Sequence, residues 1–290
     1  MKRYILPLMI FMQSIFANAQ EEIKVFGVTK DSYNKTIPYV NIGIAQSIGT
    51  VSNDKGIFKL TIPAKCINEN LMFSCIGFKN QSIPIRNLKA NSEDSIIVNL
   101  EKDSISLKEF TFIDKPFKSK IMGNEIKHNG IVSCALGTGV GAMIGVLIKN
   151  KHHTPFIIKN IGFHVHANTY DSVRIRFMFY DYADTVPGHI LSKESIFYTV
   201  KTCNDTNIII NVRKYNLVYN QDIVIVEQDL QTWPELVYHP RGNDRDFALG
   251  ASFFGATTFE KDRTWNEWEK TKVSGGSLGV KVGLFVDVLY

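Results

Sequence analysis

The feature that most constrains the fold is a succession of short runs in which apolar and polar residues alternate. Alternation with a period of two is typical of a strand with one buried face, whereas an amphipathic helix repeats every 3.6 residues. After residue 20, no stretch has a convincing helical period. Glycine-bearing turn signals such as Asn53-Asp54-Lys55-Gly56 separate the runs, and 19 Phe with 11 Tyr favour sheet. We therefore predict an all-β protein.

The first 19 residues are typical of a secretory signal peptide. Two basic residues precede an apolar run, Tyr4–Phe16, and the small-x-small site Ala17-Asn18-Ala19 follows. The run is shorter than the roughly 20 residues that a membrane helix needs, so we expect no transmembrane helix in the mature chain. We expect cleavage before Gln20 and a mature protein in the periplasm, at the outer membrane or at the cell surface.

Residues 20–101 carry the pattern of a small antiparallel sandwich. The expected strands are residues 23–28, 38–45, 57–62, 71–78, 81–85 and 95–100. Strands of this length, divided by turn signals at this spacing, predict two packed sheets with a transthyretin- or Ig-like layout.

An ordered series of motifs in this region resembles a known family. The motifs are Gly27-Val28, Pro38-Tyr39-Val40-Asn41-Ile42, the segment 49–58 and Phe73-Ser74-Cys75-Ile76-Gly77-Phe78, with Leu107-Lys108-Glu109 beyond the last strand. They resemble the carboxypeptidase regulatory-like domain, a transthyretin-like β-sandwich common in exported Bacteroidota proteins. The resemblance implies kinship with an accessory domain and no peptidase activity.

The rest of the chain predicts a linker and a second sandwich. Residues 102–130 are charged and polar, which indicates a linker with some extended structure. Within 131–290 the expected strands are residues 156–165, 173–180, 194–200, 207–212, 222–227, 247–253 and 279–290. About eight strands favour a jelly-roll-like sandwich. The layout loosely resembles the second domain of uncharacterised exported proteins that carry the regulatory-like domain.

Two segments of this half carry expectations about exposure. Between residues 173 and 180, aliphatic and Phe side chains alternate with Arg174, Arg176, Met178 and Tyr180, and we expect this second set on a wetted face. The polar segment 228–246 has few apolar anchors and is expected to be a surface loop.

Two glycine-rich motifs match enzyme patterns without their structural setting. Residues 137–142 match GxGxxA, but a strand-like run follows where the dinucleotide fingerprint needs a helix. The uncharged run 131–148 contains several glycines, so we favour buried strands there over a membrane helix. Residues 275–279 match GxSxG, but no His follows to complete a triad. We expect no cofactor and no catalytic residues.

Metal and nucleic-acid binding are not expected either. His164 and His166 would share one face of a strand and could begin a zinc site, but no HxxE or HExxH sequence supplies further ligands. We interpret them as half-exposed strand residues. The net charge of +5 falls to +3 once Lys2 and Arg3 are removed, which is too weak to indicate nucleic acid.

Four cysteines, Cys66, Cys75, Cys134 and Cys203, match no disulfide framework and no CxxC metal pattern. Cys75 lies in an apolar run, which favours a buried free thiol, although Cys66–Cys75 is a locally plausible bridge. Export permits disulfides, so their state stays open.

Six residues are candidate surface sites. Trp265 and Trp268 lie in a polar stretch and could form a ligand surface, or they could cap the sandwich core. Four Asp-Ser/Thr-aliphatic tripeptides resemble the O-glycosylation sequon of Bacteroidota. Their hydroxyl residues are Ser95, Ser104, Ser172 and Thr185.

The function that this sequence favours is a non-enzymatic exported binding or assembly module of the periplasm or outer membrane. Its partner would be a protein or polysaccharide of the cell envelope. A carbohydrate-binding accessory protein is one alternative. A small outer-membrane β-barrel is another, because residues 280–290 alternate and end in an aromatic residue.

Overall fold

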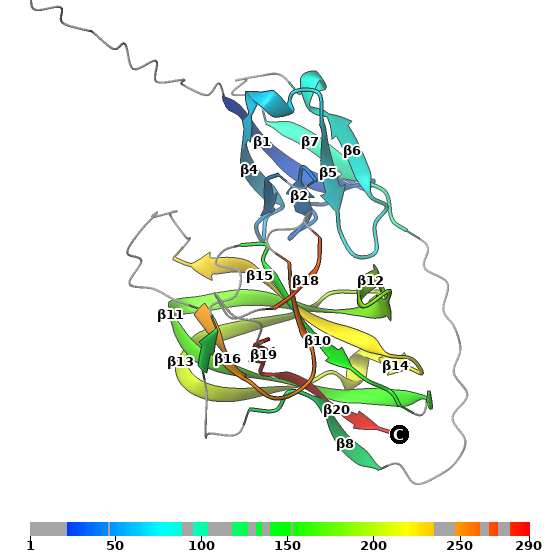
Figure 1. Ribbon diagram of the computed structural model, residues 1–290. Coiled ribbons are helices and arrows are strands. Elements are labelled where there is room, and N and C mark those ends of the chain that lie inside the picture. Colours follow the sequence, from blue (N-terminus) through cyan, green and yellow to red (C-terminus); the bar gives the residue numbers. More distant parts are fainter. Residues whose placement is uncertain are drawn as a thin grey trace, which may run out of the picture.

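The protein is nearly all β, as the sequence predicts. The structure is a computed structural model that describes residues 22–45, 47–88, 95–103, 118–126, 132–134, 140–151, 153–234, 247–261, 267–271 and 279–290, without the side chains of 132–134 and Ala183. Within these ranges the helical elements are short 3-10 turns, η1 (Ala64–Cys66), η2 (Ile85–Asn87) and η3 (Arg213–Tyr215). Two sandwiches lie one above the other in Figure 1.

The first sandwich packs two small sheets face to face. The first sheet has the order β4 (Ile57–Pro63), β1 (Glu22–Asp31), β7 (Ile96–Leu100). The second has the order β3 (Gly49–Val51), β2 (Asn41–Gly43), β5 (Asn70–Ser74), β6 (Gln81–Pro84). Phe58 and Phe73, one from each sheet, meet edge to face with ring centroids 5.7 Å apart. This contact lies in a closed apolar core, which gives the first sandwich its own hydrophobic centre.

Thirteen strands of the second sandwich form one continuous hydrogen-bonded sheet that folds over on itself. They are β8 (Ser119–Gly123), β9 (Val132–Cys134), β10 (Met143–Ile148), β11 (Phe156–Ala183), β12 (Val186–Ile190), β13 (Ile196–Asn211), β14 (Val218–Tyr219), β15 (Ile223–Trp233), β16 (Phe247–Ser252), β17 (Thr258–Lys261), β18 (Glu269–Lys270), β19 (Lys281–Val282) and β20 (Leu284–Leu289).

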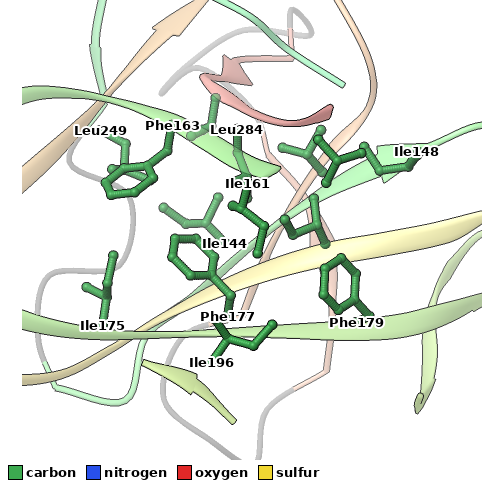
Figure 2. Close-up of a cluster of buried hydrophobic side chains, with 14 of the residues drawn as sticks. Ile144, Ile148, Ile161, Phe163, Ile175, Phe177, Phe179, Ile196, Leu249 and Leu284 are labelled. Atoms are coloured by element: carbon green, nitrogen blue, oxygen red, sulfur yellow. The ribbon is translucent and has the colours of Figure 1, made fainter. Parts of the chain in front are cut away.

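The 28-residue strand β11 belongs to both layers of this sandwich. Its first half pairs with β20 and its second half with β15, while β13 follows it along the other side. The chain folds over between the halves, since Phe163 and Phe177 lie 14 residues apart on one strand and their ring centroids are 5.4 Å apart. Figure 2 shows both rings inside the core cluster.

A buried asparagine holds the bend of β11 in place. The register between β11 and β13 shifts between Asn168 and Ser172. Asn168 is fully buried, and its Nδ2 donates to the carbonyl oxygens of Val200 (3.3 Å) and Lys201 (2.9 Å) on β13. The backbone N–H of Tyr170 donates back to Asn168 Oδ1 at 3.1 Å. These bonds satisfy polar groups that the bend takes out of the ladder.

Several strand limits differ from the sequence-based expectation. Residues 156–165 and 173–180 belong to one strand, β11, and residues 194–200 and 207–212 to one strand, β13. The expected loop 228–246 begins as strand, because β15 continues to Trp233. Within the expected linker 102–130, β8 pairs with β20 of the second sandwich. In each case pairing with a distant strand extends a segment that local sequence would end.

Candidate functional site at the junction of the two sandwiches

The segment Pro38–Asn41 is the part of the first sandwich that docks on the second. Residues 39 to 44 are all buried, although an alternating strand would expose every second side chain. Tyr39 has a left-handed backbone (φ 58°), so the extended conformation of β2 begins only after this residue. The face of Tyr39 and Asn41 is covered because β11 and β15 of the second sandwich pack against it.

A fully buried arginine is the centre of this contact. Arg176 on β11 is 1% exposed. Its Nη1 donates to the carbonyl oxygen of Tyr39 at 3.1 Å and its Nη2 to Asn41 Oδ1 at 3.1 Å. Both Nε and Nη2 also donate to Gln228 Oε1. Gln228 in turn donates from Nε2 to Asn41 Oδ1 (3.0 Å) and to the carbonyl oxygen of Gly141 (3.2 Å).

The guanidinium is buried against neutral oxygen atoms. Burial lowers the pKa of Arg176 from its usual value, because removal from water disfavours the charged form. An arginine stays protonated even so, and its planar donors fit several acceptors at fixed angles. The acceptors come from both sandwiches, so the network fixes their relative orientation.

An apolar patch next to the network completes the contact. The rings of Tyr39 and Phe197 of β13 lie at 49° to each other with centroids 5.3 Å apart, and Val51 packs with Leu230 of β15 in the same buried cluster. The guanidinium of Arg174 lies over the Phe197 ring, with Cζ 5.1 Å from its centroid. The junction therefore combines apolar burial with a directional polar network, as tight domain interfaces do.

An open groove with a volume of about 600 Å³ runs along the edge of this junction. The first sandwich lines it with residues of β1, β3, β4 and the turn before β4, and the second with Val140 and residues 230–232. Phe26 is 36% exposed at the groove, and Lys59 Nζ lies 5.6 Å from its ring centroid. Asp54 N–H donates to Gln231 Oε1 across the junction at 3.3 Å. Apolar and polar side chains therefore line the same groove.

Two acids, the buried Glu227 and the partly buried Asp229, occupy the opposite face of β15. Glu227 and Asp229 flank Gln228, and their side chains point away from the junction, in line with the core residues Ile223 and Ile225. Burial raises the pKa of Glu227 well above its usual value, and the charge of Asp229 adds to the shift. Burial raises the pKa of Asp229 to about 7. Burial therefore favours the neutral form of both carboxyl groups.

Sequence reasoning missed both the junction network and the two acids, but one signal could have found the acids. On β15 the alternating apolar positions 223 and 225 continue as Glu227 and Asp229 on the same face. Two acids that extend the buried face of a strand indicate a raised pKa. Arg176 had no such signal, since the face it shares with Met178 and Tyr180 was expected to be wetted. That expectation is wrong, because all three side chains are buried.

The structure gives a position to one of the two candidate tryptophans. Trp268 is half-buried, meets Tyr180 edge to face at 5.6 Å, and packs on the outer apolar cluster of β10, β11, β15 and β17. Lys261 Nζ lies 5.6 Å from its ring centroid. Trp268 thus caps buried apolar surface. Trp265 lies outside the described residues.

The four candidate hydroxyls are not equally accessible. Ser95 is exposed just before β7, and Thr185 is exposed in the β11–β12 turn with a left-handed backbone (φ 76°). Ser172 is buried within β11 at the bend. Ser104 lies outside the described residues. Only Ser95 and Thr185, of the three that the structure describes, offer the exposed hydroxyl that modification needs.

The structure places the two strand histidines and part of the glycine motifs. His164 and His166 share one face of β11, and His164 is 1% exposed rather than half-exposed because Gly250 of β16 lies directly against its ring. In the part of the chain that the structure describes, no three His, Cys, Asp or Glu side chains gather as metal ligands. After residues 137–142 comes strand β10 in place of the helix of a dinucleotide site. Residues 275–278 lie outside the described ranges.

The side chains of three cysteines are described, and all three are free thiols. They are Cys66, which is buried, and Cys75 and Cys203, which are half-buried. The local bridge between Cys66 and Cys75 is therefore not formed. Burial raises the pKa of the Cys75 thiol, as expected for an unreactive cysteine.

Comparisons with known proteins identify the first sandwich. Residues 25–112 match the family described as CarboxypepD_reg-like domain, which confirms the resemblance drawn from the motifs. That domain is a regulatory Ig-like fold and is not catalytic. No curated protein matches the chain. No helix among the described residues is long and apolar enough to cross a membrane.

Solved structures give only weak similarity. A structure of the infectious bursal disease virus Gt strain has a TM-score of 0.25 at 10% identity, covering 92% of this chain and 63% of that chain. A VP2 subviral particle of the same virus has a TM-score of 0.23 at 10% identity, covering 92% and 62%. The chain thus spans less than two thirds of these proteins. At such TM-scores the similarity assigns neither fold nor function.

Proposed function

We propose that this chain is a non-enzymatic binding or assembly module that is exported and acts in the periplasm or at the outer membrane. Its ligand is a protein or polysaccharide of the envelope that seats in the groove at the junction of the two sandwiches. The observation that carries the proposal is the composition of this groove. Both sandwiches line it, and the Arg176 network holds the two walls in fixed positions.

The chemistry of the groove suits recognition. It places the exposed ring of Phe26 beside Lys59, and the polar side chains of Thr50, Asn53 and Thr232 nearby. An exposed aromatic ring surrounded by hydrogen-bonding groups is a common binding anchor. Prior orientation of the walls lowers the entropy cost of binding. The carbohydrate-binding alternative depended on the pair Trp265 and Trp268. Trp268 packs on the outer apolar cluster, so it does not support that alternative.

Photo-crosslinking in the native host tests the groove. Replacement of Phe26 by a photoreactive phenylalanine analogue should give covalent adducts in the envelope fraction. The control places the same analogue at Tyr33, which is also aromatic, is 81% exposed and is absent from the groove lining. We expect adducts from position 26 and none from position 33. Equal adducts from both positions, or none from position 26, would contradict the proposed binding face.

Export has a separate test. If the signal peptide is cleaved, N-terminal sequencing of protein from the native host should begin near Gln20, in the periplasmic or outer-membrane fraction. The Phe26 experiment alone would not distinguish a cytoplasmic module from an exported one. Recovery of intact Met1 from the cytosol would refute export and leave the groove hypothesis standing.

A further inference from the structure

The edge strand β13 offers an unpaired backbone to a partner. β13 pairs with β11 along one side, and no other strand among the described residues pairs with it. The segment 206–212, Thr-Asn-Ile-Ile-Ile-Asn-Val, has high β propensity and contains neither Lys nor Pro, which natural edge strands use to prevent pairing. Ile209 at its centre is 65% exposed. An edge of this kind is a template for a further strand.

The hydrogen-bond pattern shows which groups are available. Val212 N–H donates to the carbonyl oxygen of Lys159 on β11 at 3.0 Å, and the register continues through Ile161↔Ile210 to Val165↔Thr206. In an antiparallel ladder, hydrogen-bonded pairs alternate with non-bonded pairs. Thr206, Ile208, Ile210 and Val212 therefore bond to β11. The N–H and C=O groups of Asn207, Ile209 and Asn211 point outward from the edge.

The edge sequence is symmetric about Ile209. Asn207-Ile208-Ile209-Ile210-Asn211 reads the same in both directions. When two copies pair antiparallel about a two-fold axis at Ile209, each Asn207 faces Asn211 of the other copy, and the two Ile209 residues face each other. These are the residues whose backbone groups point outward, so the register gives six hydrogen bonds between the copies.

Ile208 and Ile210 support the same pairing. Both are half-buried against the core, and a second copy of β13 would cover the part of each side chain that is still exposed.

We propose that two copies of this chain associate edge to edge through β13, antiparallel and about a two-fold axis at Ile209. The interface is isologous because the same strand of each copy contacts the other. It is closed because the two-fold axis pairs both edges with each other and leaves neither free for a third copy. It lies on the second sandwich, whereas the groove is lined by residues of β1, β3, β4 and β15. Dimerisation therefore leaves the groove open and does not depend on the function proposed for it.

Analytical ultracentrifugation of the purified mature chain, over a series of concentrations, tests the dimer. We expect the mass to approach that of two chains as the concentration rises. Ile209→Lys should raise the dissociation constant by more than about tenfold, because the symmetry places two lysines against each other. The matched control is Ile97→Lys, which alters an isoleucine 57% exposed on β7 and should leave association unchanged. A mass that stays at one chain, or a dimer that Ile209→Lys does not weaken, would refute the proposal.

Hydrogen exchange provides a readout that is independent of variants. The amides of Ile208 and Ile210 should be protected at every concentration, because they bond to β11. Those of Asn207, Ile209 and Asn211 should become protected only as the protein concentration rises. Protection of the second group that does not depend on concentration would show that the edge is covered within one chain, and would overturn the dimer.

Discussion

Arg176→Ala is expected to lower the stability of the docked protein by about 3–5 kcal/mol. The substitution removes the donors that Arg176 supplies to the Tyr39 carbonyl and to Gln228 Oε1 in a buried contact. Each buried acceptor left without a partner costs about 1–3 kcal/mol, and the vacated volume adds a cavity term. Since the acceptors come from both sandwiches, we expect calorimetry to resolve two transitions in the variant where the wild type shows one. Proteolysis between residues 102 and 130 should also become faster.

Two further variants separate the role of the network from a general effect of removing an arginine. Arg86→Ala alters an exposed side chain of the first sandwich and should change stability by no more than about 0.5 kcal/mol. Arg176→Lys keeps the charge but has one nitrogen for three acceptors, so it should lie between the wild type and Arg176→Ala. A single unchanged transition in Arg176→Ala would show that the apolar patch alone joins the sandwiches.

Asp229→Asn is expected to stabilise the protein at pH 8 and to have little effect at pH 4. The pKa of Asp229 is raised to about 7 by burial, so the folded state holds a proton that the unfolded chain releases near pH 4. The contribution of Asp229 to the free energy of unfolding therefore falls as pH rises from about 4 to about 7. The asparagine amide oxygen can still accept a hydrogen bond from Glu227. At about 1.4 kcal/mol per pKa unit, the gain at pH 8 should be about 2–4 kcal/mol.

The same substitution at another acid of the second sandwich should act in the opposite direction. Burial alone would raise the pKa of Asp287, but bonds from Lys159, Ser119 and Asn160 hold it below its usual value. This group contributes stability above its unfolded pKa and loses it as pH falls. Asp287→Asn should therefore destabilise at pH 8 and be nearly neutral at low pH. Urea unfolding of both variants from pH 4 to pH 8 measures the two slopes, and slopes of the same sign would contradict the assignment for Asp229.

The alternation of apolar residues was enough to establish the all-β class, because it depends only on the two-residue repeat of a strand. The motif series from Gly27 to Phe78 was enough to identify the first sandwich, because turn glycines and short strands in fixed order are local features. The strand predicted at Met143–Ile148 is also confirmed as β10. Each of these conclusions rests on residues that are near one another along the chain.

Only the tertiary structure decided what the second face of a strand meets. In β11 the alternation places Phe177 on one face of the strand and Arg176 and Met178 on the other. The alternation does not show which of the two faces is exposed to solvent. Arg176 is buried because the Tyr39–Asn41 segment, more than 130 residues away in sequence, packs over it. Likewise β11 is one bent strand because Asn168 satisfies the backbone of β13 at the bend. The two-residue alternation of side chains depends only on neighbouring residues in the chain. The burial of a polar face depends on which surface, distant in sequence, covers it.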